Sequence, residues 1–94
     1  MIRDAGDRFE VTGPLTLGQA RQMLEAGRLQ LGNRQDVTFD LAQVQEVDSS
    51  GLTVIFGWVR EAQRAGKPVR ITHPPQNLLS LARLYGVTEL LPLA

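Results

Sequence analysis

The apolar residues of this chain change their spacing along the sequence, from every second residue to every third or fourth and back again. A spacing of two is typical of a strand with one buried face, and a spacing of three and four is typical of a helix with one buried face. The pattern therefore predicts strands that alternate with helices. This order favours the α/β class, as a mixed β-sheet with helices packed against it.

The strands follow from the period-two segments and from the turn residues beside them. We predict strands over residues 8–12, 36–41 and 69–72. The turn residues Ala5-Gly6-Asp7 predict that a short N-terminal strand folds back on the first of these as a hairpin. The strand over residues 36–41 is the expected central strand, and a short loop joins it to a pair of serines.

Three helices follow from the remaining apolar spacing. The first is expected to start at Thr16 as its N-cap and to stop at Gly32. The second is expected to follow Gly51 and to end at the Ala65-Gly66-Lys67-Pro68 segment. The third is expected within residues 74–86, opened by one of two prolines and ended by a glycine, and the tail after it is too short to assign.

Composition limits the classes of function. With 94 residues, 43% of them apolar, the chain is expected to form one small domain over residues 1–94. Its charges sum to zero and its arginines are scattered, so nucleic acid is not an expected partner. It has no cysteine and no apolar run near the roughly 18 residues of a membrane span, so we expect a cytoplasmic protein without direct membrane insertion.

The segment Asp48-Ser49-Ser50-Gly51 is the leading candidate site. It stands where the expected central strand leads into the second helix. In open sheets of the α/β class, sites gather beyond the carboxyl ends of strands. The nearby acids, including Asp36 and Asp40, lack the spacing of a metal-binding loop and are expected on a solvated strand face. We therefore expect no metal and no cofactor.

One alternative is a small serine hydrolase that uses Asp48, Ser50 and His73, because His73 is the only histidine that could act as the base. A hydrolase elbow requires a glycine two positions before the nucleophile, and Val47 stands there if Ser49 is that nucleophile. A domain of this size also has little volume for a substrate pocket. A binding role without catalysis or small-molecule substrate is therefore favoured.

The alternative to a functional role for the serines is a structural one, in which Ser49 or Ser50 caps the second helix. Capping uses one hydroxyl and leaves the other without a role. Four further residues of this helix fall off its core stripe and predict an exposed, partner-binding face: Thr53, Val54, Gly57 and Trp58. The alternative for Val54 and Trp58 is that they widen the core stripe.

The run "VTFDLAQVQEV" followed by "DSSGL" and a helix resembles the signature of STAS domains, the family of anti-sigma factor antagonists. The resemblance covers nearly the whole chain. It implies a mixed sheet flanked by three or four helices, and a protein that binds other proteins without catalysis. In many members a hydroxyl in this loop is phosphorylated by a partner kinase, which controls binding.

The C-terminal half, with "LARLYGV" in the third helix, is similar to the MlaB-type STAS subunits of bacterial lipid-asymmetry ABC transporters. This implies a subunit peripheral to the inner membrane. It would bind the ATPase subunit, and through it the permease, and support a complex that maintains the lipid asymmetry of the outer membrane. Here Ser49 matches the functional threonine of these subunits.

In the anti-sigma antagonists the functional serine is next to the glycine, which corresponds to Ser50 in this chain. The alternative function is therefore an anti-sigma factor antagonist, regulated by serine phosphorylation in a partner-switching pathway. Both serines remain candidates for the functional hydroxyl.

Overall fold

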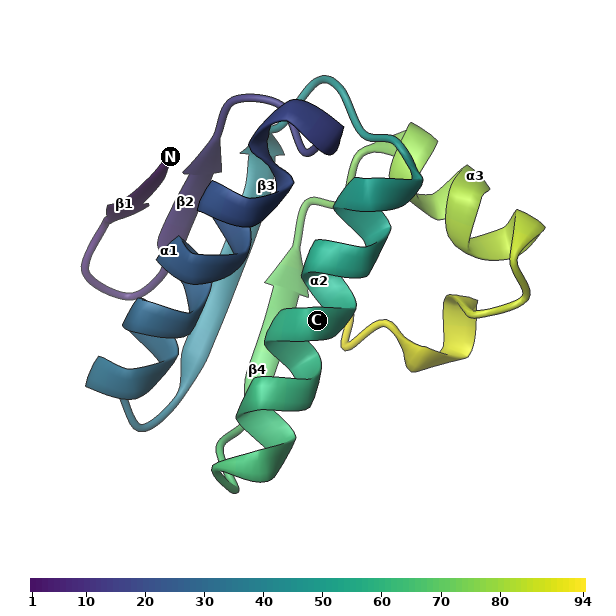
Figure 1. The fold of residues 1–94 in the computed structure, drawn as a ribbon. Coiled ribbons are helices and arrows are strands. Elements are labelled where there is room, and N and C mark those ends of the chain that lie inside the picture. Colours follow the sequence, from purple (N-terminus) through teal and green to yellow (C-terminus); the bar gives the residue numbers. More distant parts are fainter.

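A four-stranded mixed sheet forms the centre of the computed structural model, which describes residues 1–94 (Figure 1). Its order is β1-β2-β3-β4. β1 is antiparallel to β2, whereas β2, β3 and β4 are parallel. The strand bounds are Ile2–Asp4, Phe9–Thr12, Val37–Gln43 and Val69–Thr72. The predicted α/β fold with a mixed sheet is confirmed, and the N-terminal hairpin is as expected.

The two longest helices, α1 and α2, lie side by side over the same face of the sheet, and α3 lies beyond the N-terminal half of α2 (Figure 1). The helical elements are η1 Leu17–Gln19, α1 Ala20–Asn33, α2 Ser49–Arg64, α3 Gln76–Leu84 and η2 Thr88–Leu90. The C-terminal tail lies beside β4, because Ile71 forms a parallel bridge with Leu93. None of the helices has the length and apolar content that crossing a membrane requires.

The first helix differs in detail from its prediction. The chain enters it through the 3₁₀ turn η1, and the Thr16 side chain caps no backbone amide. Its hydroxyl instead donates a hydrogen bond to the side chain of Gln19. At the other end, α1 runs through Gly32 to Asn33, because this glycine keeps a helical conformation. Gly66 and Gly86, in contrast, have φ angles of 69° and 70° after α2 and α3, as expected of helix ends.

Trp58 of α2 lies at the centre of the core. Its side chain is 0% exposed, and its ring stacks on Phe39 of β3 with a centroid distance of 4.3 Å. Its indole N–H donates to the carbonyl oxygens of Met23 and Leu24 in α1, at 3.1 and 3.2 Å. A glycine of α1, Gly27, leaves room for the ring at this crossing. One side chain thereby joins the sheet and both helices.

The expectation that Val54 and Trp58 form an exposed face is wrong. They are 3% and 0% exposed, so they widen the core stripe of α2, as the alternative proposed. The physical reason is that α2 packs on the sheet, where Trp58 stacks on Phe39, and also on α1 and α3, and therefore buries a wider arc than a helix on a sheet alone. Thr53 is exposed, and Gly57 is half-buried where Leu24 of α1 packs against it.

Candidate functional site

The Asp48 to Gly51 loop lies beyond the carboxyl end of β3, beside the loop that follows β2. Leu15 of that second loop forms a parallel bridge with Val47. The amide of Leu15 donates to the carbonyl oxygen of Glu46 at 2.9 Å, and the amide of Asp48 donates to the carbonyl oxygen of Leu15 at 3.2 Å. The two loops therefore form one hydrogen-bonded rim at the expected end of the sheet.

Asp48, and not a serine, is the N-cap of α2. One oxygen of its carboxylate accepts hydrogen bonds from the amides of Ser50 and Gly51, at 2.8 and 3.2 Å. The other oxygen accepts from the amide of Leu17 at 3.1 Å. The carboxylate thus satisfies amides at the starts of two helices, η1 and α2. The alternative that a serine caps this helix is wrong, because the neighbouring carboxylate takes that position.

Both serine hydroxyls are therefore available for other contacts. Ser49 is exposed and Ser50 is half-buried, and neither hydroxyl makes a hydrogen bond within the chain. They stand in the first turn of α2, where the helix dipole favours negative charge. A phosphate on either serine would lie beside the Asp48 carboxylate, so it would make the loop more negative.

Gly51 explains why this loop lies so close to its neighbour. A Cβ atom at this position would overlap the carbonyl oxygen of Leu15 and would lie 2.8 Å from the Leu15 Cβ atom. Gly51 itself is buried. The first turn of α2 can therefore touch the backbone of the loop after β2 only if a glycine stands here.

The hydrolase alternative requires contacts that the structure does not show. His73 follows β4, and its Nδ1 atom lies 3.1 Å from the carboxylate of Asp40. The Asp48 carboxylate accepts from backbone amides only. His73 makes no hydrogen bond to Ser50 or to the Asp48 carboxylate, so the base-activated nucleophile that a serine hydrolase requires is not formed.

Asp40 corrects another expectation, since it is not a solvated strand residue. It is 6% exposed, and as the residue after Phe39 in β3 it lies on the sheet face opposite to the one where Phe39 stacks on Trp58. Its carboxylate accepts hydrogen bonds from Arg8 at 3.1 Å and from the amide of Ala42 at 2.9 Å. Burial alone would raise the pKa of Asp40, but these hydrogen bonds and the charge of His73 hold the pKa below its ordinary value. Asp40 of β3 thus connects the turn before β2, through Arg8, with the segment after β4, through His73.

The surface around α3 carries candidate residues that the sequence reasoning did not name, although it considered the third helix as part of a docking surface. One hollow, of about 360 Å³, reaches the serine loop and is lined by Ser49, Leu52, Thr53, Phe56, Tyr85 and Val87. A second, of about 610 Å³, lies on the other side of α3 and is lined by Val47, Gln76, Asn77, Ser80, Leu81 and Leu84. We call the α3 surface the full set of residues that line either of these two hollows.

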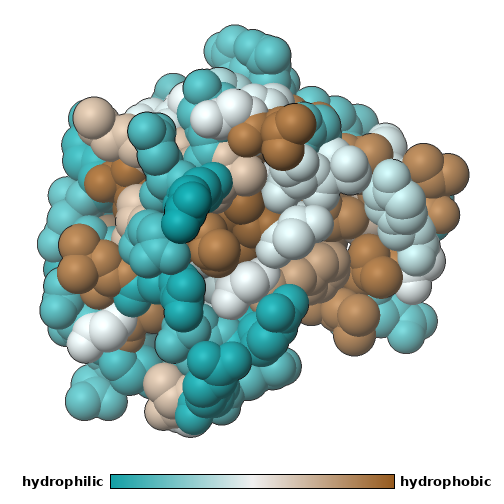
Figure 2. Space-filling view, in the orientation of Figure 1, coloured by the Kyte–Doolittle hydropathy of each residue, from teal (hydrophilic) through white to brown (hydrophobic).

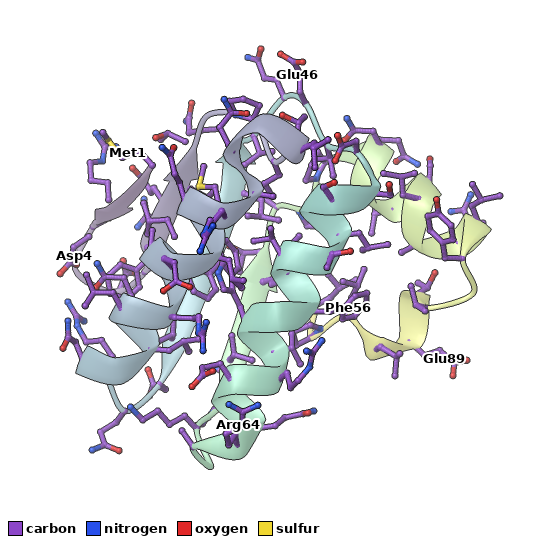
Figure 3. The ribbon with its side chains drawn as sticks, in the orientation of Figure 1. Met1, Asp4, Glu46, Phe56, Arg64 and Glu89 are labelled. Carbon is purple, nitrogen blue, oxygen red and sulfur yellow. The ribbon has the colours of Figure 1, made fainter.

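This α3 surface is partly apolar and accessible. Leu84 and Tyr85 are 75% and 55% exposed, and Phe56 projects from α2 toward the segment after α3 (Figure 3). Figure 2 shows hydrophobic side chains at the surface over α3 and the C-terminal segment. The signal in the sequence was the Leu84-Tyr85 pair, which falls off the stripe of α3 that buries Leu78 and Ala82.

The fold matches solved structures of anti-sigma factor antagonists. The unphosphorylated form of SpoIIAA superposes with a TM-score of 0.73 and 13% identity, over 100% of this chain and 86% of that one. The phosphorylated form of the Bacillus cell fate determinant SpoIIAA gives a TM-score of 0.71 and 14% identity, over 100% and 89%. At this identity the likeness establishes the fold alone.

The sequence is similar to the intermembrane phospholipid transport system binding protein MlaB of Haemophilus influenzae. The two are 38% identical over 53 residues, which are 56% of this chain and 50% of that protein. The chain thus spans about half the length of this curated relative. The family model described as "Mlab, STAS domain" matches residues 2–92, so the chain belongs to the MlaB-type STAS domain family.

Proposed function

We propose that this protein is a non-catalytic subunit of a phospholipid-transport ABC complex. In this role it binds the ATPase subunit, and through it the permease, and supports the assembly and activity of the complex. It then works in the cytoplasm, peripheral to the inner membrane, in the maintenance of outer-membrane lipid asymmetry. Membership of the MlaB-type family and the likeness to the Haemophilus influenzae protein support this proposal.

The observation that carries the proposal is the continuity between the serine loop and the α3 surface. Ser49 lines the first hollow, and Val47, the residue before Asp48, lines the second, so one hollow includes the loop and the other lies next to it. An exposed apolar patch beside a polar rim marks an interaction site, and tyrosine is enriched among the residues that contribute most to interface affinity. Asp48 fixes the loop through three backbone amides, so little conformational freedom is lost when a partner binds.

The geometry favours Ser49 over Ser50 as the hydroxyl that controls binding. Ser49 is exposed and lines the first hollow, whereas Ser50 is half-buried and lines neither hollow. A phosphate adds about −1.5 to −2 charges at neutral pH, and an apolar partner surface does not tolerate that charge. We therefore expect Ser49→Asp to weaken partner binding more than Ser50→Asp does, with both variants folded.

The first experiment is a pull-down of the tagged protein from native membranes in mild detergent, with the co-purifying chains identified by mass spectrometry. We expect an ATPase and a permease in a fixed ratio. Leu84→Ser should reduce the recovered ATPase, and Leu29→Ser is the matched control. Both leucines are exposed on helices, at 75% and 63%, but Leu29 lies on α1 outside the α3 surface.

Two outcomes would contradict the proposal. Equal recovery of the ATPase with Leu84→Ser and Leu29→Ser would show that the α3 surface is not the docking site. Recovery of a soluble kinase or an anti-sigma factor, with no membrane protein, would instead assign the protein to a partner-switching pathway. Thermal melts of both variants should match the parent, because each substitution changes an exposed side chain.

A further inference from the structure

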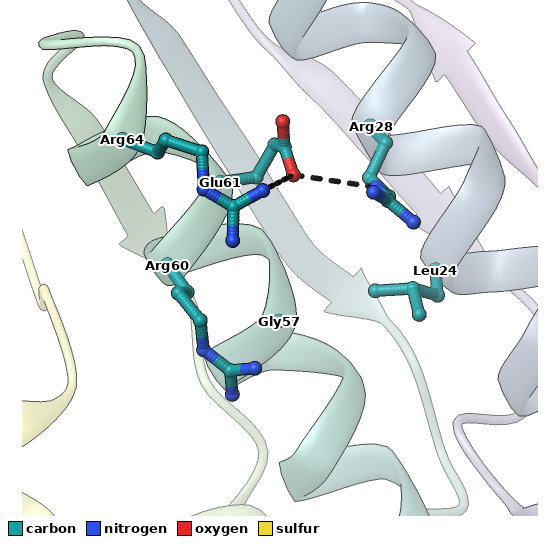
Figure 4. Close-up of a pocket in the computed structure, with 6 residues that line it drawn as sticks. All are labelled: Leu24, Arg28, Gly57, Arg60, Glu61 and Arg64. Atoms are coloured by element: carbon teal, nitrogen blue, oxygen red, sulfur yellow. Dashed lines mark ion pairs between the residues drawn. The ribbon is translucent and has the colours of Figure 1, made fainter.

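A notch between α1 and α2 gathers three arginine side chains at the end of α2 that is remote from the serine loop (Figure 4). Arg28 comes from α1, and Arg60 and Arg64 come from α2. The floor is formed where Leu24 packs against Gly57, and the cavity has a volume of about 120 Å³. Three guanidinium groups therefore border one small, open space.

These guanidinium groups are only partly neutralised within the chain. Glu61 is the single carboxylate that lines the notch, and its Oε1 atom lies 3.4 Å from Arg28 and 3.6 Å from Arg64. Both distances are longer than a good hydrogen bond. Arg28 also pairs with Glu25 at 3.1 Å, whereas Arg60 makes no ion pair and no hydrogen bond. Most of the N–H donors of Arg60 and Arg64 thus remain free.

We propose that this notch binds an acidic segment of a protein partner. Arg60 and Arg64 stand one helical turn apart on the same face of α2, so their Cβ atoms are about 6 Å apart. Two carboxylates one turn apart on a partner helix have the same spacing. Each guanidinium can hold one carboxylate in a bidentate pair, which gives both strength and orientation.

The residues around the notch favour a protein, and not a lipid surface, as its binding partner. Only one of its six lining residues, Leu24, is hydrophobic, and none of the large exposed hydrophobic side chains of the chain lines it. A membrane surface would also require a broader excess of positive charge than this neutral chain has. Within the chain, Glu25 and Glu61 both lie beside Arg28, and Glu61 lies beside Arg64, so two of the three guanidinium groups already face carboxylates.

The notch is a second contact, distinct from the α3 surface. Fifteen positions separate Ser49 from Arg64 along α2, which corresponds to about 22 Å of helix. The inference does not depend on the identity of the partner at the α3 surface. A partner that bound both would therefore have to extend along α2, or two partner chains would have to bind.

The test uses the purified full chain and NMR titration, with the arginine side-chain Nε–Hε signals as the readout. The probe is a capped helical peptide with two glutamates at positions i and i+4, and the control peptide carries glutamine at both positions. We expect the glutamate peptide to shift the signals of Arg60 and Arg64. The double variant Arg60→Gln, Arg64→Gln should lower the affinity on the order of 10-fold.

Arg70→Gln is the matched control, because Arg70 is also exposed and unpaired but lies on β4. It should keep the affinity of the parent within about two-fold. Three results would overturn the proposal: equal shifts with the glutamine peptide, an equal loss with Arg70→Gln, or no shift with the glutamate peptide. Tighter binding of inorganic phosphate, or of phosphatidylglycerol vesicles, to the same arginines would overturn it as well.

Discussion

The crossing of α1 and α2 depends on one glycine, and Gly27→Ala is the sharpest test of that packing. A Cβ atom at Gly27 would lie 2.6 Å from Cδ1 of Trp58 and still closer to its Nε1. The indole cannot move aside freely, because it stacks on Phe39 and donates to two carbonyl oxygens of α1. The added methyl group must therefore push α1 away or tilt the ring.

The expected cost follows from three contributions. Overpacking a core costs about 1–3 kcal/mol. Loss of the buried indole hydrogen bonding costs about 1–2 kcal/mol more. Alanine returns about 1 kcal/mol through its higher helix propensity. These contributions span about 1–4 kcal/mol, so we expect Gly27→Ala to lower the free energy of unfolding by about 2.5 kcal/mol, the middle of that range. For a domain of this size, that change lowers the Tm by about 10–20 °C.

Gly32→Ala is the matched control in the same helix. No atom lies within 4 Å of a Cβ built at Gly32, and its φ is not in the left-handed region. We expect the same change there to leave the free energy of unfolding unchanged or to raise it by up to about 1 kcal/mol. The assay is urea denaturation followed by circular dichroism, with the fluorescence of the single tryptophan as a second probe.

The reasoning is refuted if Gly27→Ala is as stable as the parent. A double-mutant cycle provides a stricter test, because the penalty should come from the indole alone. In a Trp58→Leu background the smaller side chain leaves space for the methyl group, so Gly27→Ala should cost much less than it does in the parent. An unchanged cost in that background would place the strain elsewhere.

Three further predictions concern the loop and Asp40. Gly51→Ala should destabilise the fold by about 2–4 kcal/mol in urea denaturation, since its Cβ would overlap the Leu15 backbone. Asp48→Ala should cost about 2–3 kcal/mol by the same assay, because three amides lose their acceptor, and Asp48→Asn should cost less. Asp40→Asn should cost about 1–3 kcal/mol at pH 7. The folded pKa of Asp40 lies below its ordinary value of 3.8, so the stability from this carboxylate is present above that pH and is lost as the pH falls through the folded pKa. The difference in stability between Asp40→Asn and the parent should therefore shrink as the pH falls below 3.8.

The sequence predicted much of the fold because each element carries its own local signal. Apolar spacing identified the strands and the helices, and two glycines with positive φ ended α2 and α3 where expected. The position of the serine loop at the end of β3 followed from the strand and helix order alone. Asp48 as the cap was missed, because aspartate and serine are both good N-caps and adjacent residues compete for that position.

Burial was harder to predict from the sequence. Period-two spacing placed Asp40 on the polar face of its strand, and the spacing cannot show that Arg8 and His73 come from other segments to cover it. The same limit applied to α2, since helical periodicity gives the direction of the core but not the number of neighbours. Trp58 became a core residue because α1 crosses α2 at Gly27, a contact between residues 31 positions apart.

The sequence by itself determined the order of strands and helices, the helix ends at Gly66 and Gly86, and the loop with two serines, because these depend on neighbours within a few residues. Only the tertiary structure decided which side chains remain accessible. It buried Trp58 in the core and left Leu84 and Tyr85 exposed on the α3 surface. The physical reason is that exposure depends on what other segments cover, and chain folding brings those segments together over long separations.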